Sequence, residues 1–129
     1  MAQLVLATRN SHKLDEVRRL LAPAGIAVSP LPEGVVLPPE VGKTFAENAL
    51  PKARAAARAL GVPAIADDSG IEAEALGGAP GVRSARFAGE RATDEQNLSK
   101  LMREAPGGSG LRYVCALAYV DPRVGEEQV

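Results

Sequence analysis

The sequence predicts an α/β fold, in which strands and helices alternate along one chain. Three observations lead to this prediction. Short apolar runs recur along the 129 residues, segments with helical spacing of apolar residues lie between them, and stretches rich in glycine and proline separate the two kinds. The chain contains neither an internal repeat nor a low-complexity segment, so we expect a single domain over residues 1–129.

The first elements follow the N-terminus closely. Residues 3–8 (QLVLAT) are a short apolar run that predicts a buried strand. A helix is expected next, with Ser11 as its N-cap and Gly25 as its stop. Residues 26–31 (IAVSPL) predict a second strand, and the proline- and glycine-rich stretch 30–42 predicts a loop.

A second, longer helix is expected in the alanine- and arginine-rich segment. Thr44 and Glu47 have the spacing of a capping box at its start, and Gly61 marks its end. Pro51 lies inside this segment and has no N–H to donate to the carbonyl of residue 47. We therefore expect Pro51 to kink or interrupt the helix.

The middle of the chain predicts two short strands and a loop. Residues 62–66 (VPAIA) are apolar and lead directly into Asp67 and Asp68, whereas residues 71–76 alternate apolar and acidic side chains. Residues 77–92 contain four glycines and one proline, and their length is typical of a functional loop.

The last elements are a capped helix from Thr93 to Glu104 and an apolar strand over residues 111–120. The helix side chains expected to face inward are Leu98, Leu101 and Met102. Cys115 lies among apolar neighbours in the strand, so we expect it to be an inert residue of the core.

Composition excludes several classes of function. Fifteen Lys and Arg against sixteen Asp and Glu leave a net charge of −1, so no positive field attracts nucleic acid or an anionic membrane surface. A single cysteine excludes an intrachain disulfide and Cys-cluster metal sites, and a single histidine (His12) nearly excludes His-based metal sites. The longest apolar stretch, residues 113–120, is too short for a membrane span, and no signal peptide is visible, so we expect a cytoplasmic protein.

The predicted strand-to-helix turn from Thr8 to Lys13 (TRNSHK) is a candidate anion site. Free N–H groups and the helix dipole at a helix start attract phosphate, and polar side chains here could add donors. The candidate substrate contacts in this turn are Thr8, Arg9, Asn10, Ser11, His12 and Lys13. The alternative is an ordinary turn, because any strand–turn–helix unit presents such residues.

The string ADDSG, residues 66–70, is the most informative local feature. Two adjacent carboxylates at the carboxyl end of an apolar strand repel each other unless a cation compensates them. Carboxylate oxygens suit Mg²⁺, and the chain offers no softer ligand set. The alternative is a simple turn sequence without a ligand.

Taken in order, four segments resemble the Ham1/RdgB-type inosine triphosphate pyrophosphatases. These segments are LATRNSHKLDEVRRLL, GKTFAENALPKARAAA, PAIADDSGIEAEALGGAPGVRSARFAGE and ATDEQNLSKLM. The resemblance runs from Leu4 to about Met102 and implies a central mixed β-sheet flanked by helices, in a homodimer. It also implies hydrolysis of non-canonical purine nucleoside triphosphates (ITP, dITP, XTP) to the monophosphate and pyrophosphate, which removes them from the nucleotide pool.

The resemblance also implies roles for individual residues. The family's T-x-N-x-x-K turn matches Thr8, Asn10 and Lys13, which would hold phosphate oxygens together with Lys52 of the E-N-A-x-x-K-A segment.

The same comparison implies a metal site. Glu40 matches an acidic ligand of Mg²⁺, for which Mn²⁺ could substitute, and Asp68 matches a second ligand that is also the general base. Ser69 would touch the substrate.

The family's later G-F-G-Y-D-P and S-H-R segments, which recognise the purine and complete the phosphate site, do not occur in this sequence. We therefore expect the N-terminal part of the family's α/β domain. A non-catalytic nucleotide-binding module is the alternative function.

Overall fold

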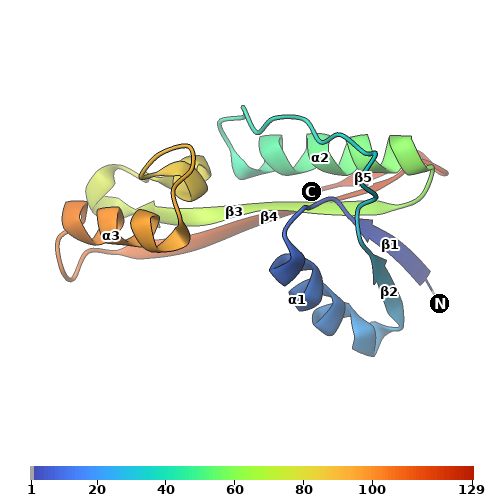
Figure 1. The fold of residues 1–129 in the computed structure, drawn as a ribbon, viewed down its shortest axis with the longest axis horizontal. Helices are drawn as coiled ribbons and strands as arrows, with labels where there is room; N and C mark the ends of the chain where they lie inside the picture. The colour runs from blue at the N-terminus through green and yellow to red at the C-terminus, as the bar shows by residue number, and fades with distance from the viewer. Residues whose placement is uncertain (1) are drawn as a thin grey trace.

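The computed structural model describes residues 2–129 and contains one mixed five-stranded sheet, as predicted (Figure 1). Its order is β2-β1-β3-β4-β5; β1 is parallel to β2 and β3, whereas β4 is antiparallel to β3 and β5. The strands are β1 (Ala2–Leu6), β2 (Ile26–Ser29), β3 (Ala64–Ala73), β4 (Leu111–Asp121) and β5 (Glu126–Gln128). The short β5 is an element that the sequence patterns did not predict.

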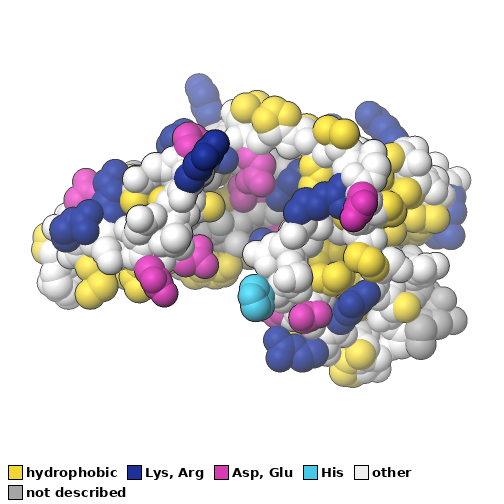
Figure 2. All heavy atoms as spheres, in the orientation of Figure 1, with side chains coloured by type: hydrophobic (Ala, Val, Ile, Leu, Met, Phe, Trp, Pro, Cys, Tyr) yellow, Lys and Arg dark blue, Asp and Glu magenta, His cyan; other side chains and the backbone are white. Residues whose placement is uncertain are grey.

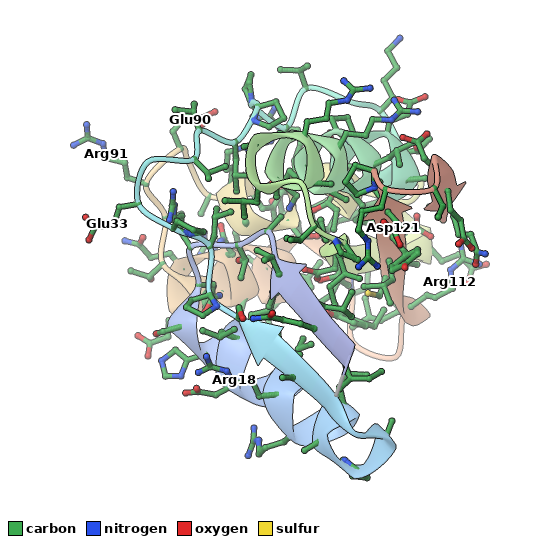
Figure 3. All side chains as sticks on the ribbon, turned by 90° about the vertical axis from the view of Figure 1, so that its right-hand side faces the viewer. Arg18, Glu33, Glu90, Arg91, Arg112 and Asp121 are labelled. Atoms are coloured by element: carbon green, nitrogen blue, oxygen red, sulfur yellow. The ribbon has the colours of Figure 1, made fainter. Side chains whose placement is uncertain are left out.

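Helices lie on both faces of the sheet. The α-helices are α1 (Ser11–Leu21), α2 (Phe45–Leu60) and α3 (Asp94–Glu104), and the 3-10 helices are η1 (Ala22–Ala24), η2 (Glu74–Leu76) and η3 (Gly81–Arg86). Figure 3 shows α1 and α2 on opposite sides of β1 and β2. In Figure 1, α3 and η3 lie at the far end of the long β3–β4 ribbon. The sheet thus has a three-layered end and an end that carries only a small helical cap.

Alanine explains how closely α2 approaches the sheet. Ala49, Ala53, Ala56 and Ala57 are all fully buried, and they pack in one cluster with small residues of the central strands such as Ala66. Alanine is also the strongest helix former. The helix is continuous over its 16 residues, so of the predicted kink or interruption at Pro51, the interruption does not occur.

Both ends of α2 lie at the residues predicted. The hydroxyl of Thr44 accepts a hydrogen bond from the Glu47 N–H at 3.1 Å, and Gly61 ends the helix with a φ of 66°. The carboxylate of Glu47 accepts from the Lys43 N–H and not from that of Thr44, so the predicted capping box is incomplete.

One prediction in the middle of the chain is corrected: residues 64–73 form a single strand, not two strands separated by a turn. Successive side chains in a strand point to opposite faces of the sheet. The carboxylates of Asp67 and Asp68 therefore lie on opposite faces and do not face each other. Gly70 is buried at a close contact, because a Cβ there would lie 2.4 Å from the Ser84 hydroxyl and 2.6 Å from the Gly81 carbonyl oxygen. Its small size is required by packing, not by a turn.

The predicted inward face of the last helix is also corrected. Leu101 is buried, but Leu98 is 54% and Met102 72% exposed. Cys115 is exposed as well, against the prediction of a core residue. The reason is that its face of β4, which also carries the exposed Tyr113, extends beyond the part of the sheet that α1 covers.

In residues 2–129, no helix combines the length and the apolarity needed to cross a membrane.

Candidate functional site

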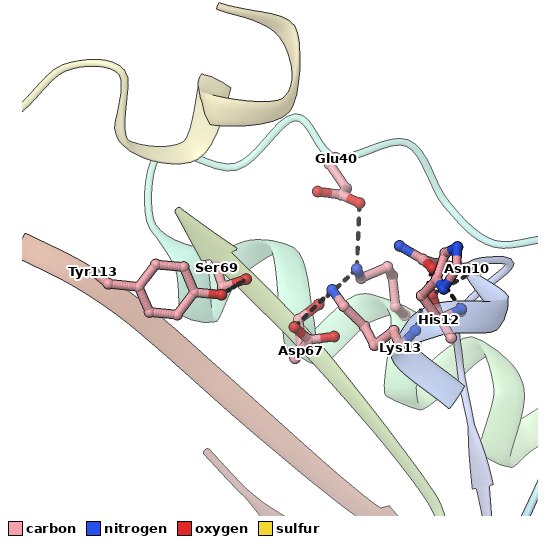
Figure 4. A network of polar contacts seen from close by, with 9 residues as sticks. Asn10, His12, Lys13, Glu40, Asp67, Ser69 and Tyr113 are labelled. Atoms are coloured by element: carbon pink, nitrogen blue, oxygen red, sulfur yellow. Dashed lines mark hydrogen bonds and ion pairs between the residues drawn. The ribbon is translucent and has the colours of Figure 1, made fainter. Parts of the chain in front are cut away.

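The candidate site lies where β1 ends and β3 continues. β1 pairs with β3 only at Ala64 and Ile65. β4, in contrast, pairs with every residue of β3. The edge of β3 beyond Ile65 therefore faces the turn that follows β1 and the loop that precedes α2. This topology places the predicted residues from four segments around Asp67 (Figure 4).

Lys13 and Asp67 form an ion pair on one side of the site. The Nζ atom of Lys13 donates to Asp67 Oδ2 at 2.8 Å, and both side chains are largely shielded from water. Burial alone would lower the pKa of Lys13, but the hydrogen bond and charge of Asp67 raise it above the ordinary value. Lys13 is therefore a firmly protonated cation.

Lys52 supplies a second, more deeply buried cation. Its Nζ donates to the Asp67 carbonyl oxygen at 2.7 Å and to Glu40 Oε1 at 3.2 Å. The neighbouring Pro51 does not turn this side chain away from the site. Lys52 thus connects α2 with both the strand and the loop that carry the acidic residues.

Asp68 and Glu40 form a carboxyl pair on the α2 side of β3. Asp68 is 8% exposed, and Asn48 Nδ2 donates to its Oδ2 at 3.0 Å. Burial raises the pKa of Asp68, and the charge and hydrogen bonding of Glu40 raise it further, against the opposing effects of Asn48 and Lys52. Glu40 is therefore close enough to disfavour the charged form of Asp68, and a bound cation would relieve this repulsion.

The residues present fit Mg²⁺. Within residues 2–129 no three His, Cys, Asp or Glu side chains are grouped to hold a metal ion. Mg²⁺ nevertheless commonly binds through one or two carboxylates, keeps several waters and also takes substrate phosphates. Glu40 and Asp68 would provide the two carboxylates.

Asn48 is a buried member of the site that the sequence patterns did not identify. It is 3% exposed, and its Oδ1 accepts from the Gly42 N–H at 2.7 Å. A recognisable pattern was present, because Asn48 and Lys52 are two polar residues four apart on the alanine-rich face of α2.

The turn after β1 is only partly as predicted. The N-cap of α1 is Asn10, not Ser11: Asn10 Oδ1 accepts from the backbone N–H groups of His12 and Lys13 at 3.0 and 3.2 Å. Those two amides already have a partner, which weakens the argument that they bind phosphate. The Thr8 hydroxyl accepts from the Asn10 N–H at 3.2 Å, so it stabilises the same turn.

Of the other predicted residues of this turn, Arg9 contacts another loop, and Ser11 and His12 lie at the surface. The guanidinium of Arg9 donates to four carbonyl oxygens of residues 31–35 at 2.6–3.2 Å, so it secures that loop instead of facing the site. Ser11 and His12 are exposed, and the histidine is visible on the surface in Figure 2.

Ser69 lies at the edge of a cavity of about 460 Å³, a volume typical of ligand pockets. Its hydroxyl accepts a hydrogen bond from the Tyr113 hydroxyl at 2.8 Å. Asn10 and Lys13 also line this cavity, so it opens beside the predicted phosphate contacts. Figure 2 shows the surface hollowed in the middle of the molecule, with acidic and basic side chains inside the hollow.

Comparisons with known proteins show which family the chain resembles. The chain is 52% identical over 126 residues to the dITP/XTP pyrophosphatase of Ralstonia nicotianae, an alignment that covers 93% of this chain and 63% of that protein. It is 49% identical over 125 residues to the dITP/XTP pyrophosphatase of Photorhabdus laumondii, covering 93% and 64% respectively. The chain thus spans less than two thirds of the length of these relatives.

Solved structures share the fold. A HAM1 protein from Coxiella burnetii superposes with a TM-score of 0.84 at 39% identity, over 99% of this chain and 68% of that one. The nucleoside-triphosphatase/dITP/XTP pyrophosphatase of Mycobacterium abscessus gives a TM-score of 0.75 at 38% identity, over 98% and 69%.

The similarity extends further along the chain than the motifs alone indicated. The family model described as Ham1 family matches residues 4–129, which includes β4 and β5 beyond Met102. With this match over almost the whole chain, the protein belongs to the Ham1 family.

Proposed function

We propose that this chain is the N-terminal part of a nucleoside-triphosphate pyrophosphatase that hydrolyses dITP, XTP and ITP to the monophosphate and pyrophosphate. The observation that carries this proposal is the carboxyl pair of Glu40 and Asp68 with the two cations Lys13 and Lys52 beside it. The names of the relatives support the substrate class.

The charges suit phosphoanhydride hydrolysis. Negative charge develops on the phosphate oxygens in the transition state, and positive groups placed in advance stabilise it. Lys13 and Lys52 are such groups, and their contacts with Asp67 and Glu40 hold them in place before substrate arrives.

Glu40 and Asp68 would hold Mg²⁺ or Mn²⁺, which supplies charge neutralisation for the phosphates and a more acidic water. Asp68 is the general base in this proposal: its carboxylate accepts a proton from the attacking water, while its contact with Asn48 fixes its orientation. Ser69 and Asn10 lie at the substrate cavity and would contact the nucleotide.

The test is steady-state pyrophosphate release from dITP, XTP and ATP, with and without Mg²⁺, using the full-length natural protein. We expect Mg²⁺-dependent release from dITP and XTP and much less from ATP. Binding of these nucleotides without pyrophosphate release would refute the enzyme and favour a nucleotide-binding module.

We also propose a cytoplasmic homodimer, on the strength of the family resemblance. The exposed thiol of Cys115 is compatible with a reducing compartment. Sedimentation equilibrium would measure the assembly, and a monomer at micromolar concentration would refute it.

A further inference from the structure

Asn48 is connected at both ends of its side chain. It lies in the first turn of α2 and is 3% exposed, so its carboxamide has little access to water. Its Oδ1 accepts from the Gly42 N–H at 2.7 Å, and its Nδ2 donates to Asp68 Oδ2 at 3.0 Å. One side chain therefore joins the loop before α2 to the central strand.

This connection links the two carboxyls of the site. Gly42 lies two residues after Glu40, so its contact with Asn48 restrains the loop segment that carries the Glu40 carboxylate. One helical turn further along, Lys52 contacts Glu40 directly and also the carbonyl oxygen of Asp67, next to Asp68. Two side chains of α2 thus hold the same loop against the same strand.

The chemistry of the two partners favours asparagine. A backbone N–H can only donate and an ionised carboxylate can only accept, so the bridging side chain must present an acceptor on one side and a donor on the other. An aspartate would place an oxygen against Asp68, and an alanine would remove both of these bonds.

The glycine at position 42 fits the same arrangement. A Cβ there would lie 2.7 Å from Asn48 Oδ1 and 2.6 Å from Glu47 Cβ, so any other residue would push the loop away from α2. The loop approaches the helix this closely only because the side chain is absent.

We propose that Asn48 is a positioning residue, which sets the spacing between Glu40 and Asp68 for a divalent cation while leaving the contacts of Lys13 unchanged. This inference rests on the proposed function, in which the divalent cation takes part in pyrophosphate release. Residues that orient metal ligands without touching the metal typically change metal affinity by about 10- to 100-fold.

The test measures Mn²⁺ binding without nucleotide, by calorimetry, in the full-length protein. Asn97 provides a matched control: it is 9% exposed, its Oδ1 accepts from the Ala88 N–H at 2.8 Å, and its Nδ2 donates to the Ala85 carbonyl at 3.0 Å. Asn48→Ala and Asn97→Ala therefore remove comparable pairs of hydrogen bonds, but only the first faces the carboxyl pair.

We expect Asn48→Ala to weaken Mn²⁺ binding at least about 10-fold, and Asn97→Ala to change it less than about twofold. At saturating Mg²⁺, the KM of Asn48→Ala for dITP should stay within about threefold of the unmutated value, because Lys13 keeps its position. If Asn48→Ala does not fold, Gly42→Ala, which displaces the loop and leaves the Asp68 contact in place, should show the same loss of Mn²⁺ affinity.

Unchanged Mn²⁺ affinity in the folded Asn48 or Gly42 variant would overturn the proposal, and so would an equal loss in Asn97→Ala. Failure of the proposed function looks different. In that case the unmutated protein binds Mn²⁺ and releases no pyrophosphate, while the Asn48 effect on Mn²⁺ binding persists.

Discussion

Replacing Asp68 with asparagine should lower activity and raise stability at the same time. The substitution keeps the size of the side chain, and the amide oxygen can still accept from Asn48 Nδ2, so the packing of this buried position is preserved. What is lost is the negative charge and the ability to accept a proton from water.

The expected loss of activity is large. A general base contributes about 10²–10⁴-fold to the rate, which corresponds to about 3–5 kcal/mol of activation free energy. Loss of one of the two carboxylates that would hold the cation adds to this. Pyrophosphate release from dITP at saturating Mg²⁺ should therefore fall at least about 100-fold.

The expected change in stability has the opposite sign. Burial and the charge of Glu40 raise the pKa of Asp68, so the folded state retains this proton at a pH where the unfolded chain has lost it. The free energy of unfolding therefore falls as pH rises through that range, and at neutral pH the buried carboxylate is destabilising. In EDTA at neutral pH, Asp68→Asn should raise the Tm, by about 3–5 °C for each 1 kcal/mol gained. At a pH below the ordinary pKa of aspartate the difference should vanish.

Asp67→Asn is the matched control for this experiment. It makes the same change one residue away, on the other face of β3, where it removes a partner of Lys13. It should lower the Tm and reduce the rate less than Asp68→Asn does. An undiminished rate in Asp68→Asn would refute its assignment as the base, and a lower Tm at neutral pH would refute the argument from burial.

Four further perturbations test other parts of the structure. Lys13→Ala should raise the KM for dITP by about 10-fold or more in steady-state assays, because a charged hydrogen bond is worth about 1.5–3 kcal/mol. An unchanged KM would show that Lys13 pairs with Asp67 and does not bind the substrate. Gly70→Ala should lower the free energy of unfolding in urea by about 1–3 kcal/mol, since its Cβ would lie 2.4 Å from the Ser84 hydroxyl, and an undiminished midpoint would contradict that packing. Excess EDTA should abolish turnover whereas Cys115→Ser should not affect it, and turnover that persists in EDTA would exclude the carboxylate metal site.

Local patterns predicted those elements whose formation depends on neighbours in the chain. The alanine-rich segment with Thr44 at its start and Gly61 at its end gave a correct helix, because caps and helix propensity act within a few residues. The N-cap of the first helix was misplaced by one residue, from Ser11 to Asn10, since both residue types can cap and the choice depends on the path of the turn.

The interpretation of the two aspartates shows where local reasoning fails. Their adjacency suggested mutual repulsion at the end of a strand, but β4 pairs with β3 along residues 64–73 and keeps this segment extended. Extended backbone sends the two side chains to opposite faces, and each finds a different partner: Lys13 for Asp67, and Asn48 for Asp68. Pairing with a strand about fifty residues away therefore decided the chemistry of this motif.

By itself the sequence determined the α/β class and the alternation of elements, because these follow from composition and spacing. Most charged groups of the candidate site were predicted through the resemblance of its motifs to a known family. Only the tertiary structure decided which groups meet. It joined Lys52, Glu40 and Asp67, turned Arg9 away to the 31–35 loop, and revealed Asn48 between the loop and the strand. The physical reason is that hydrogen bonds and charge interactions act over a few ångströms, so partners distant in sequence become partners only after the sheet and α2 have packed.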